Sequence, residues 1–183
     1  MFGLIDYFKF FSCRVNRIEP SPIREIVRLI TEYRKKGVKV ISFATGDPDP
    51  ELIPRKTLGK LAREVLEKEP RSVTYAPTAG IPELREELLK FVERYDGVKA
   101  SLENILVTVG GQEALDLIGR VLFDPGDIVV VENPSYVNTL LAFKQFGANL
   151  VGVPVDEEGM KTDVLEDTVL LVLGRRLKVH LFI

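Results

Sequence analysis

Two adjacent glycines stand where an apolar run gives way to a helical pattern. Residues Ile105–Val109 predict a strand, and apolar side chains from Gln112 to Phe123 recur at helical spacing. The first N–H groups of an α-helix have no acceptor within the helix and lie at the positive end of its dipole. Because glycine lets an anion approach the backbone closely, Gly110, Gly111 and Gln112 indicate a phosphate site, with an ordinary tight turn as the alternative.

An aromatic residue follows the next predicted strand. The run Ile128–Val131 leads into Glu132–Tyr136, and ligands of open α/β sheets bind at the carboxyl ends of the strands. Both loops are therefore expected on one rim, with Tyr136 beside the anion site, although a packing role for its ring is the alternative. A phosphate cradle next to an aromatic ring favours a flat, phosphorylated ligand. The chain lacks the G-x-G-x-x-G and G-x-x-x-x-G-K-[ST] patterns of dinucleotide and P-loop sites.

The composition predicts a globular, metal-free protein. The chain has 183 residues, of which 45% are hydrophobic and 28% charged. It holds a single histidine, His180, and a single cysteine, Cys13, which are too few for a zinc site or an internal disulfide. The formal charge of −2 gives no reason to expect nucleic acid or an anionic membrane surface as a partner.

No targeting or membrane signal is evident in the sequence. No stretch reaches the roughly 18 uncharged apolar residues of a membrane span. Residues 1–13 are rich in phenylalanine but include Asp6 and Lys9, which does not fit a secretory signal. We therefore expect a cytoplasmic location.

The first half of the chain predicts three amphipathic helices. The first begins at Ser21-Pro22 and ends at Lys35-Lys36-Gly37, followed by a short strand over Val38–Ala44 and a loop over Thr45–Pro50. A second spans Leu58–Leu66 and ends before Pro70, and a third opens at Pro82, carries apolar residues from Leu84 to Tyr95 and stops near Gly97.

The second half predicts alternating strands and helices, the pattern of an α/β fold. Helices are expected over 112–123 and about 135–146, between strands at 105–109, 128–131 and 150–155, with a last strand over 178–183. The run Ile128–Val131 has no polar alternation, which indicates a parallel strand covered on both faces.

Five motifs in order resemble those of a known family. They lie at Ser42–Pro50, Tyr75–Gly80 with Glu83-Leu84-Arg85, Gly110–Asp116, Glu132–Tyr136 and Asp156–Met160. In order and spacing the chain resembles the N-terminal half of class I/II aminotransferases over roughly residues 15 to 165. The likeness is greatest to the archaeal multi-substrate, 2-aminoadipate and kynurenine-type branch.

The resemblance implies a pyridoxal 5′-phosphate enzyme of fold type I that works as a homodimer. It moves an amino group between an amino acid and a 2-oxo acid. It also implies an α/β large domain, with a parallel-rich sheet flanked by helices and preceded by a helical arm. Residues 1–50 would form the N-terminal arm and a small-domain segment, and residues 51–183 an incomplete cofactor-binding large domain that ends mid-domain.

The same resemblance implies roles for particular residues. Gly110, Gly111 and Gln112 would hold the cofactor phosphate, and Tyr136 would stack on the pyridine ring. Tyr75 would reach the phosphate of the neighbouring subunit, and Gly46 would lie by the substrate carboxylate. The chain departs from the family at Val109 and Gly111, where hydroxyl residues are usual, so a side-chain bond to phosphate is missing.

A second departure concerns catalysis. Family members run to about twice this length, and their Schiff-base lysine, the aspartate that pairs with the pyridine nitrogen and the carboxylate-binding arginine come later in the chain. No catalytic residue is therefore expected within these residues, and the chain as given is expected to be truncated and inactive. Thr168–Lys178 also departs from the charged helix expected there, which suggests an interrupted reading frame.

Two non-enzymatic alternatives stay open. One is the aminotransferase-like effector domain of a transcription regulator, which would need a DNA-binding segment ahead of the first matched helix near residue 21. The other is a degenerate remnant without function, or one that pairs with a full-length homologue.

Overall fold

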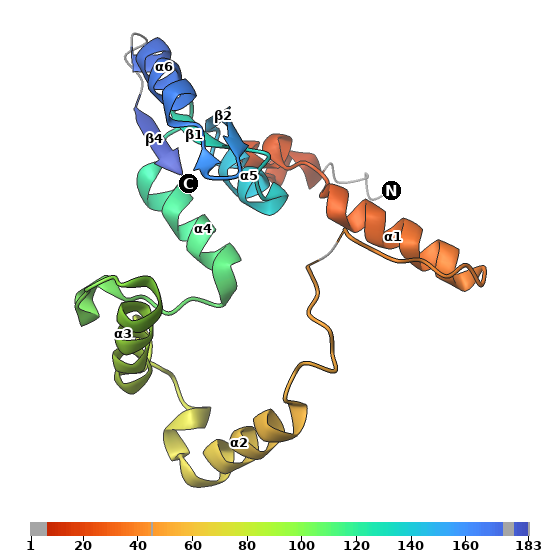
Figure 1. Cartoon of the computed structure of the whole chain (residues 1–183), viewed down its shortest axis with the longest axis vertical. Coiled ribbons are helices and arrows are strands. Elements are labelled where there is room, and N and C mark those ends of the chain that lie inside the picture. Colours follow the sequence, from red (N-terminus) through yellow and green to blue (C-terminus); the bar gives the residue numbers. More distant parts are fainter. Residues whose placement is uncertain (1–6, 45, 174–177, 183) are drawn as a thin grey trace, which may run out of the picture. The chain divides into compact units, whose positions relative to one another are not determined.

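The chain divides into two compact units. The computed structural model describes residues 7–44, 46–173 and 178–182 (Figure 1). One unit combines residues 1–44 with residues 109–183, and the other consists of residues 45–108.

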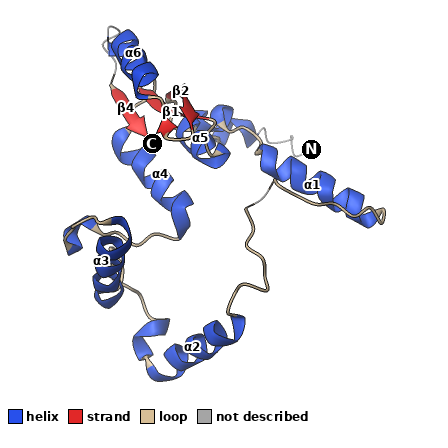
Figure 2. Cartoon of the chain, viewed as in Figure 1, coloured by secondary structure: helices blue, strands red, loops and turns tan. Residues whose placement is uncertain are grey.

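The first unit is built on a four-stranded sheet. The strands are β1 (Ile128–Asn133), β2 (Asn149–Asp156), β3 (Gly159–Met160) and β4 (Val179–Phe182), in the order β3-β2-β1-β4. Figure 2 labels β1, β2 and β4 among the strands, which are drawn in red. β1 pairs in parallel with both β2 and β4, and β3 returns antiparallel to β2. The sheet is thus mixed but parallel at its centre, which confirms the predicted α/β class.

The central strand β1 supplies the core on both of its faces. Successive strand side chains point to opposite faces, and all four residues from Ile128 to Val131 are buried. Val129 and Val131 belong to one apolar cluster, with residues of α4 and α5, and Ile128 and Val130 belong to a second cluster, with residues of α6. The prediction of a strand covered on both faces is confirmed.

In the described part of the first unit, three helices pack on this sheet, and three helical segments come before them in the sequence. They are α4 (Gly110–Leu122), α5 (Val137–Lys144) and α6 (Thr162–Leu173), preceded by η1 (Tyr7–Phe10), η2 (Cys13–Arg17) and α1 (Pro22–Lys35). The Lys144 ammonium binds the Glu19 carboxylate at 3.0 Å, which attaches the segment before α1 to the end of α5.

The second unit is helical. It contains α2 (Arg55–Lys68), η3 (Pro70–Val73), α3 (Pro82–Asp96) and η4 (Leu102–Asn104). α3 begins at Pro82 and is followed by Gly97, whose φ of 68° gives the left-handed cap predicted from the sequence.

The three predicted helices of the first half are confirmed as α1, α2 and α3. The predicted helix over 135–146 was too long at both ends, because α5 spans only Val137–Lys144. Tyr136, just before the helix, has an extended backbone, at φ −68° and ψ 119°. β2 agrees with the predicted strand, and β4 agrees over Val179–Phe182. Residue 183 lies outside the described residues.

Two predicted strands are wrong. Residues 38–44 and 105–109 form no strand, and no neighbouring strand within the described part of the chain supplies a ladder for either of them. Ile105 is extended, at φ −112° and ψ 120°, and the Val107 N–H donates to the Ala79 carbonyl of a loop at 3.1 Å. A strand-like sequence without a strand partner therefore stays an extended loop.

The sequence did not predict β3, α6 or the four short 3-10 helices η1–η4. β3 forms a short hairpin with β2, and α6 includes Thr168–Leu173 although that stretch departs from the charged pattern expected there. Residues 174–177 lie outside the described residues. None of the described helices is long and apolar enough to cross a membrane.

A turn before β1 fixes the edge strand β4. The Asp127 N–H donates to the Asp124 carbonyl at 3.1 Å, as expected for the predicted turn over Asp124–Asp127. The buried Asp127 carboxylate accepts the Asp124 N–H at 2.8 Å and lies 3.4 Å from His180 Nε2 on β4. Lys178, just before β4, binds Asp124 at 2.7 Å.

Asp127→Asn tests this turn through pH. The pKa of the Asp127 carboxyl is held below its ordinary value, chiefly because the carboxylate accepts the Asp124 N–H and further because of His180. Such a carboxylate adds stability above its unfolded pKa of about 3.9, and the contribution is lost as pH falls through the lower folded value. At pH 7 the variant should lose about 1–3 kcal/mol of unfolding free energy.

Unfolding measurements at acidic pH show whether the charge of the Asp127 carboxylate stabilises the turn, or only the shape of the side chain. The difference between parent and Asp127→Asn, measured by urea unfolding, should shrink as pH falls from 5 to 3. Asp167→Asn on the exposed side of α6 serves as the control. A difference that stays constant over that range would show that the charge of Asp127 does not stabilise the turn.

Candidate functional site

The first turn of α4 carries the glycine pair singled out in the sequence. Gly110 has φ +74°, a region that residues with a side chain rarely adopt. Gly111 is not among the positive-φ glycines, and a Cβ built on it would meet no atom within 4 Å. There is thus space for a side chain at position 111, and Gly110 is the residue whose conformation requires glycine.

A carboxylate already binds the start of this helix. The Val109 N–H donates to Oε2 of Glu113, one turn further along α4. The side chain of Glu113 thus does at this helix what an anionic ligand does at others, because negative oxygen is favoured at the positive end of the helix dipole. The donor set at Gly110, Gly111 and Gln112 fits an anion in the same way.

Tyr136 stands immediately before α5, at the carboxyl end of β1. Tyr136 is 60% exposed, and its hydroxyl accepts a hydrogen bond from Asn138 Nδ2 at 2.8 Å. The Tyr136 carbonyl accepts the Thr139 N–H at 3.0 Å, which begins the helix. The ring is therefore held at its hydroxyl end and remains accessible, as a residue that stacks on a ligand requires.

The helices that follow these two loops pack against each other. Gln145 Nε2 donates to Asp116 Oδ1 of α4 at 3.3 Å, and the buried Gly119 of α4 lies against the ring of Phe146. In Figure 1 the arrow of β4 points toward the side at which α4 begins. The first turn of α4 and the carboxyl ends of the parallel strands thus face the same side of this unit, although the strand predicted to lead into the glycines is absent.

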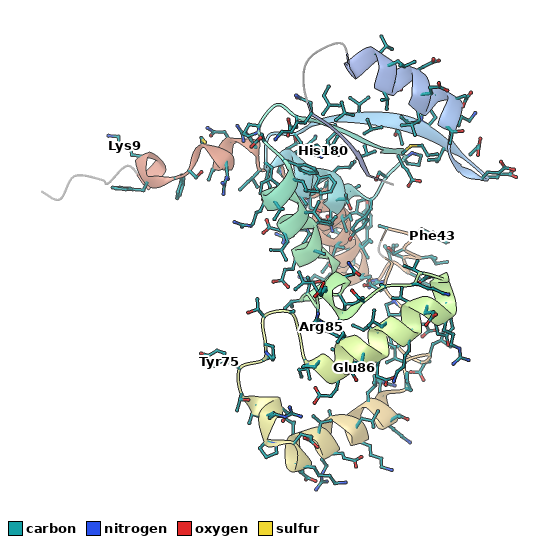
Figure 3. All side chains as sticks on the ribbon, turned by 90° about the vertical axis from the view of Figure 1, so that its left-hand side faces the viewer. Lys9, Phe43, Tyr75, Arg85, Glu86 and His180 are labelled. Carbon is teal, nitrogen blue, oxygen red and sulfur yellow. The ribbon has the colours of Figure 1, made fainter. Side chains whose placement is uncertain are left out.

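Tyr75 and Gly46 belong to the other unit. The Tyr75 side chain is fully exposed and projects from the loop that precedes α3 (Figure 3). A Cβ on Gly46 would meet nothing within 4 Å. Gly110, Gly111, Gln112 and Tyr136 thus belong to one unit. The roles predicted for them, and those predicted for Tyr75 and Gly46, stay predictions.

Comparison with known proteins identifies the family. A family model described as aminotransferase class I and II matches residues 38–169. The chain belongs to this family. Aromatic-amino-acid aminotransferase 1 of Thermococcus litoralis is 42% identical over 165 residues, which are 89% of this chain and 38% of that protein.

Solved aminotransferase structures agree with this assignment. An archaeal alanine:glyoxylate aminotransferase is 56% identical with a TM-score of 0.89, over 96% of this chain and 43% of that one. A kynurenine aminotransferase of Pyrococcus horikoshii, solved in complex with PMP, is 36% identical with a TM-score of 0.81, over 95% and 42%. The chain thus spans about two fifths of the length of these aminotransferases.

The sequence reasoning missed two polar contacts of the site. Glu113 and Asn138 were not singled out, although each lies within a few residues of a predicted site residue. A glutamate one turn into a helix is a known signal for capping at the helix start. The Asn138 contact with the Tyr136 hydroxyl has no comparable sequence signal. The described residues contain no cluster of three or more His, Cys, Asp or Glu side chains suited to a metal ion.

Glu113 is testable as the acceptor at the start of α4. Glu113→Ala removes the acceptor of the Val109 N–H and should cost about 1 kcal/mol of stability. Glu113→Gln keeps an oxygen acceptor and should retain most of it, which makes it the matched control. Hydrogen exchange of the Val109 amide is the readout. Equal protection in parent and Glu113→Ala would contradict the assignment.

Proposed function

We propose that this chain is part of a pyridoxal 5′-phosphate-dependent aminotransferase. The reaction is the transfer of an amino group between an amino acid and a 2-oxo acid. The observation that supports this most directly is the start of α4, where a glycine with positive φ opens a helix end that already binds the Glu113 carboxylate, in the unit that also carries the exposed ring of Tyr136. These features suit the phosphate and the flat ring of the cofactor.

In this proposal the phosphate is held mainly by backbone groups. The N–H groups of Gly111 and Gln112 stand in the first turn of α4, where a helix has no carbonyl of its own to offer them. Their hydrogen bonds to a dianion are charge-assisted and therefore strong. Val109 and Gly111 add no hydroxyl, so the cradle depends on the backbone and on the helix dipole.

Tyr136 positions the cofactor ring. An offset aromatic pair adds about 0.5–1.5 kcal/mol beyond the area it buries, and the Asn138 contact limits the freedom of the tyrosine side chain. When bound, the cofactor supplies an electron sink for bond changes at the α-carbon of an amino acid. The chain's own residues hold and orient it.

The remaining assignments extend the proposal to a dimer. Tyr75 contacts the cofactor phosphate of a second subunit, and Gly46 lies by the substrate carboxylate. The aminotransferases compared above are named for aromatic amino acids, alanine with glyoxylate, and kynurenine. Their diversity supports an amino acid and a 2-oxo acid as substrate classes. We also propose a cytoplasmic location, an arm over residues 1–50 and a cofactor domain over residues 51–183.

Two substitutions should change cofactor affinity in opposite directions. Gly111→Ser should strengthen cofactor binding, because it places a hydroxyl where the backbone has space. A hydrogen bond from that hydroxyl to the charged phosphate contributes roughly 1.5–3 kcal/mol. Tyr136→Ala removes the stacking contact and should weaken binding by about 0.5–1.5 kcal/mol or more. Equilibrium titration of the purified protein with pyridoxal 5′-phosphate, followed by absorbance, measures both.

Gly110→Ser is the matched control for the glycine loop. Its positive φ opposes any side chain by about 1–2 kcal/mol, so this variant should not gain affinity. Unchanged affinity in both Gly111→Ser and Tyr136→Ala would mean that this loop and this ring do not form the cofactor site.

The 183 residues taken by themselves are proposed to be inactive. The family resemblance places the Schiff-base lysine outside them. Borohydride reduction of the chain mixed with pyridoxal 5′-phosphate, followed by peptide mapping, should give no single stoichiometrically labelled lysine. One unique labelled lysine together with measurable transamination would refute this part of the proposal.

A further inference from the structure

An arginine of the second unit holds two backbone carbonyls at once. Arg85 lies on α3 and is half-buried (Figure 3). Its Nε donates to the Ile105 carbonyl at 3.0 Å, and its Nη2 donates to the Leu102 carbonyl. Because a guanidinium presents its donors in a rigid planar fork, this contact fixes the segment after η4 relative to α3.

The chain that continues from this segment packs at Val107 against the loop that carries Tyr75 and ends at Gly80. Gly80, at the end of that loop, has φ +102°, and a Cβ there would lie only 2.6 Å from Val107 Cγ2. The Val107 N–H donates to the Ala79 carbonyl at 3.1 Å. The backbone of the loop therefore packs directly on Val107, and glycine is required at position 80 for both conformation and space.

The other end of the loop is also attached. The Thr74 N–H and Oγ1 donate to the Arg71 carbonyl at 3.2 and 3.0 Å. Arg71 in turn forms an ion pair with Glu83 of α3 at 3.1 Å, although both side chains are exposed and the pair is weak. Tyr75, which follows Thr74 directly, is thus presented to solvent from a loop held at both ends.

We infer that Arg85 is a positioning residue for cofactor binding, acting through the Tyr75 loop. This rests on the proposed function, in which Tyr75 contacts the phosphate of the neighbouring subunit. Arg85 fixes the segment 102–105, Val107 of the continuing chain holds the loop at Ala79 and Gly80, and Gly110 follows three residues later in sequence. One set of contacts therefore holds the loop that carries Tyr75 against α3 and the segment 102–107.

A double-mutant cycle between Arg85 and Tyr75 tests the inference. Pyridoxamine 5′-phosphate is titrated into the purified protein and its Tyr75→Phe, Arg85→Met and doubly substituted variants. Tyr75→Phe should weaken binding about tenfold, because it removes a hydrogen bond to a charged group. Arg85→Met should weaken binding severalfold in the parent but less than twofold when Tyr75 is already phenylalanine, since its effect passes through that residue.

Two further variants separate positioning from general damage. Arg94→Met, on the exposed side of the same helix, should leave the affinity unchanged. Arg85→Lys keeps the charge but cannot span both carbonyls, so it should fall between the parent and Arg85→Met, and it replaces Arg85→Met in the cycle if that variant does not fold. Hydrogen exchange over residues 75–80 should accelerate with Arg85→Met and not with Arg94→Met.

The outcomes distinguish the inference from the proposed function. Additive effects of the Arg85 and Tyr75 substitutions, or full affinity in Arg85→Met, would overturn the inference and leave the proposed function intact. Unchanged affinity in Tyr75→Phe would refute the role proposed for Tyr75 and the inference with it. If the parent does not bind pyridoxamine 5′-phosphate at all, both fail.

Discussion

The burial of β1 on both faces is the constraint on which the site depends. The strand alternates its side chains between two apolar clusters, one shared with α4 and α5 and the other with α6. Its register is set on both sides by parallel pairing, with Ile128 opposite Asn149 of β2 and opposite Val179 of β4. Its carboxyl end then delivers Tyr136 to one side of the sheet, and α4, which packs on one face, begins on that same side.

The cofactor site proposed at the start of α4 consists mostly of backbone groups. At the start of α4 the useful groups are N–H donors and a helix dipole, and a Cβ at either glycine would meet no atom within 4 Å. Glu113, which accepts the Val109 N–H, shows that this helix end binds negatively charged oxygen. In the proposed aminotransferase the same chemistry is directed at a phosphate. Because Val109 and Gly111 have no hydroxyl, the backbone N–H groups would make more of the hydrogen bonds to the phosphate.

How much the sequence could predict depended on whether a signal was local. The apolar run of β1, the proline at the start of α3 and Gly97 after it are local signals, and the elements they predict are present. Residues 38–44 and 105–109 have strand-like sequences, but a strand requires a partner, and partners are not encoded locally. For the site, the glycine pair and Arg85 both stand in motifs of the sequence, but the contacts of Arg85 could not be predicted, because its carbonyl partners lie 17 and 20 residues away.

The most direct test of the central claim is a crystal structure of the purified protein with pyridoxal 5′-phosphate. The account predicts the phosphate within hydrogen-bond distance of the Gly111 and Gln112 amides, with the ring of Tyr136 over the pyridine. A phosphate bound elsewhere, or a Tyr136 ring turned away from the cofactor, would contradict it.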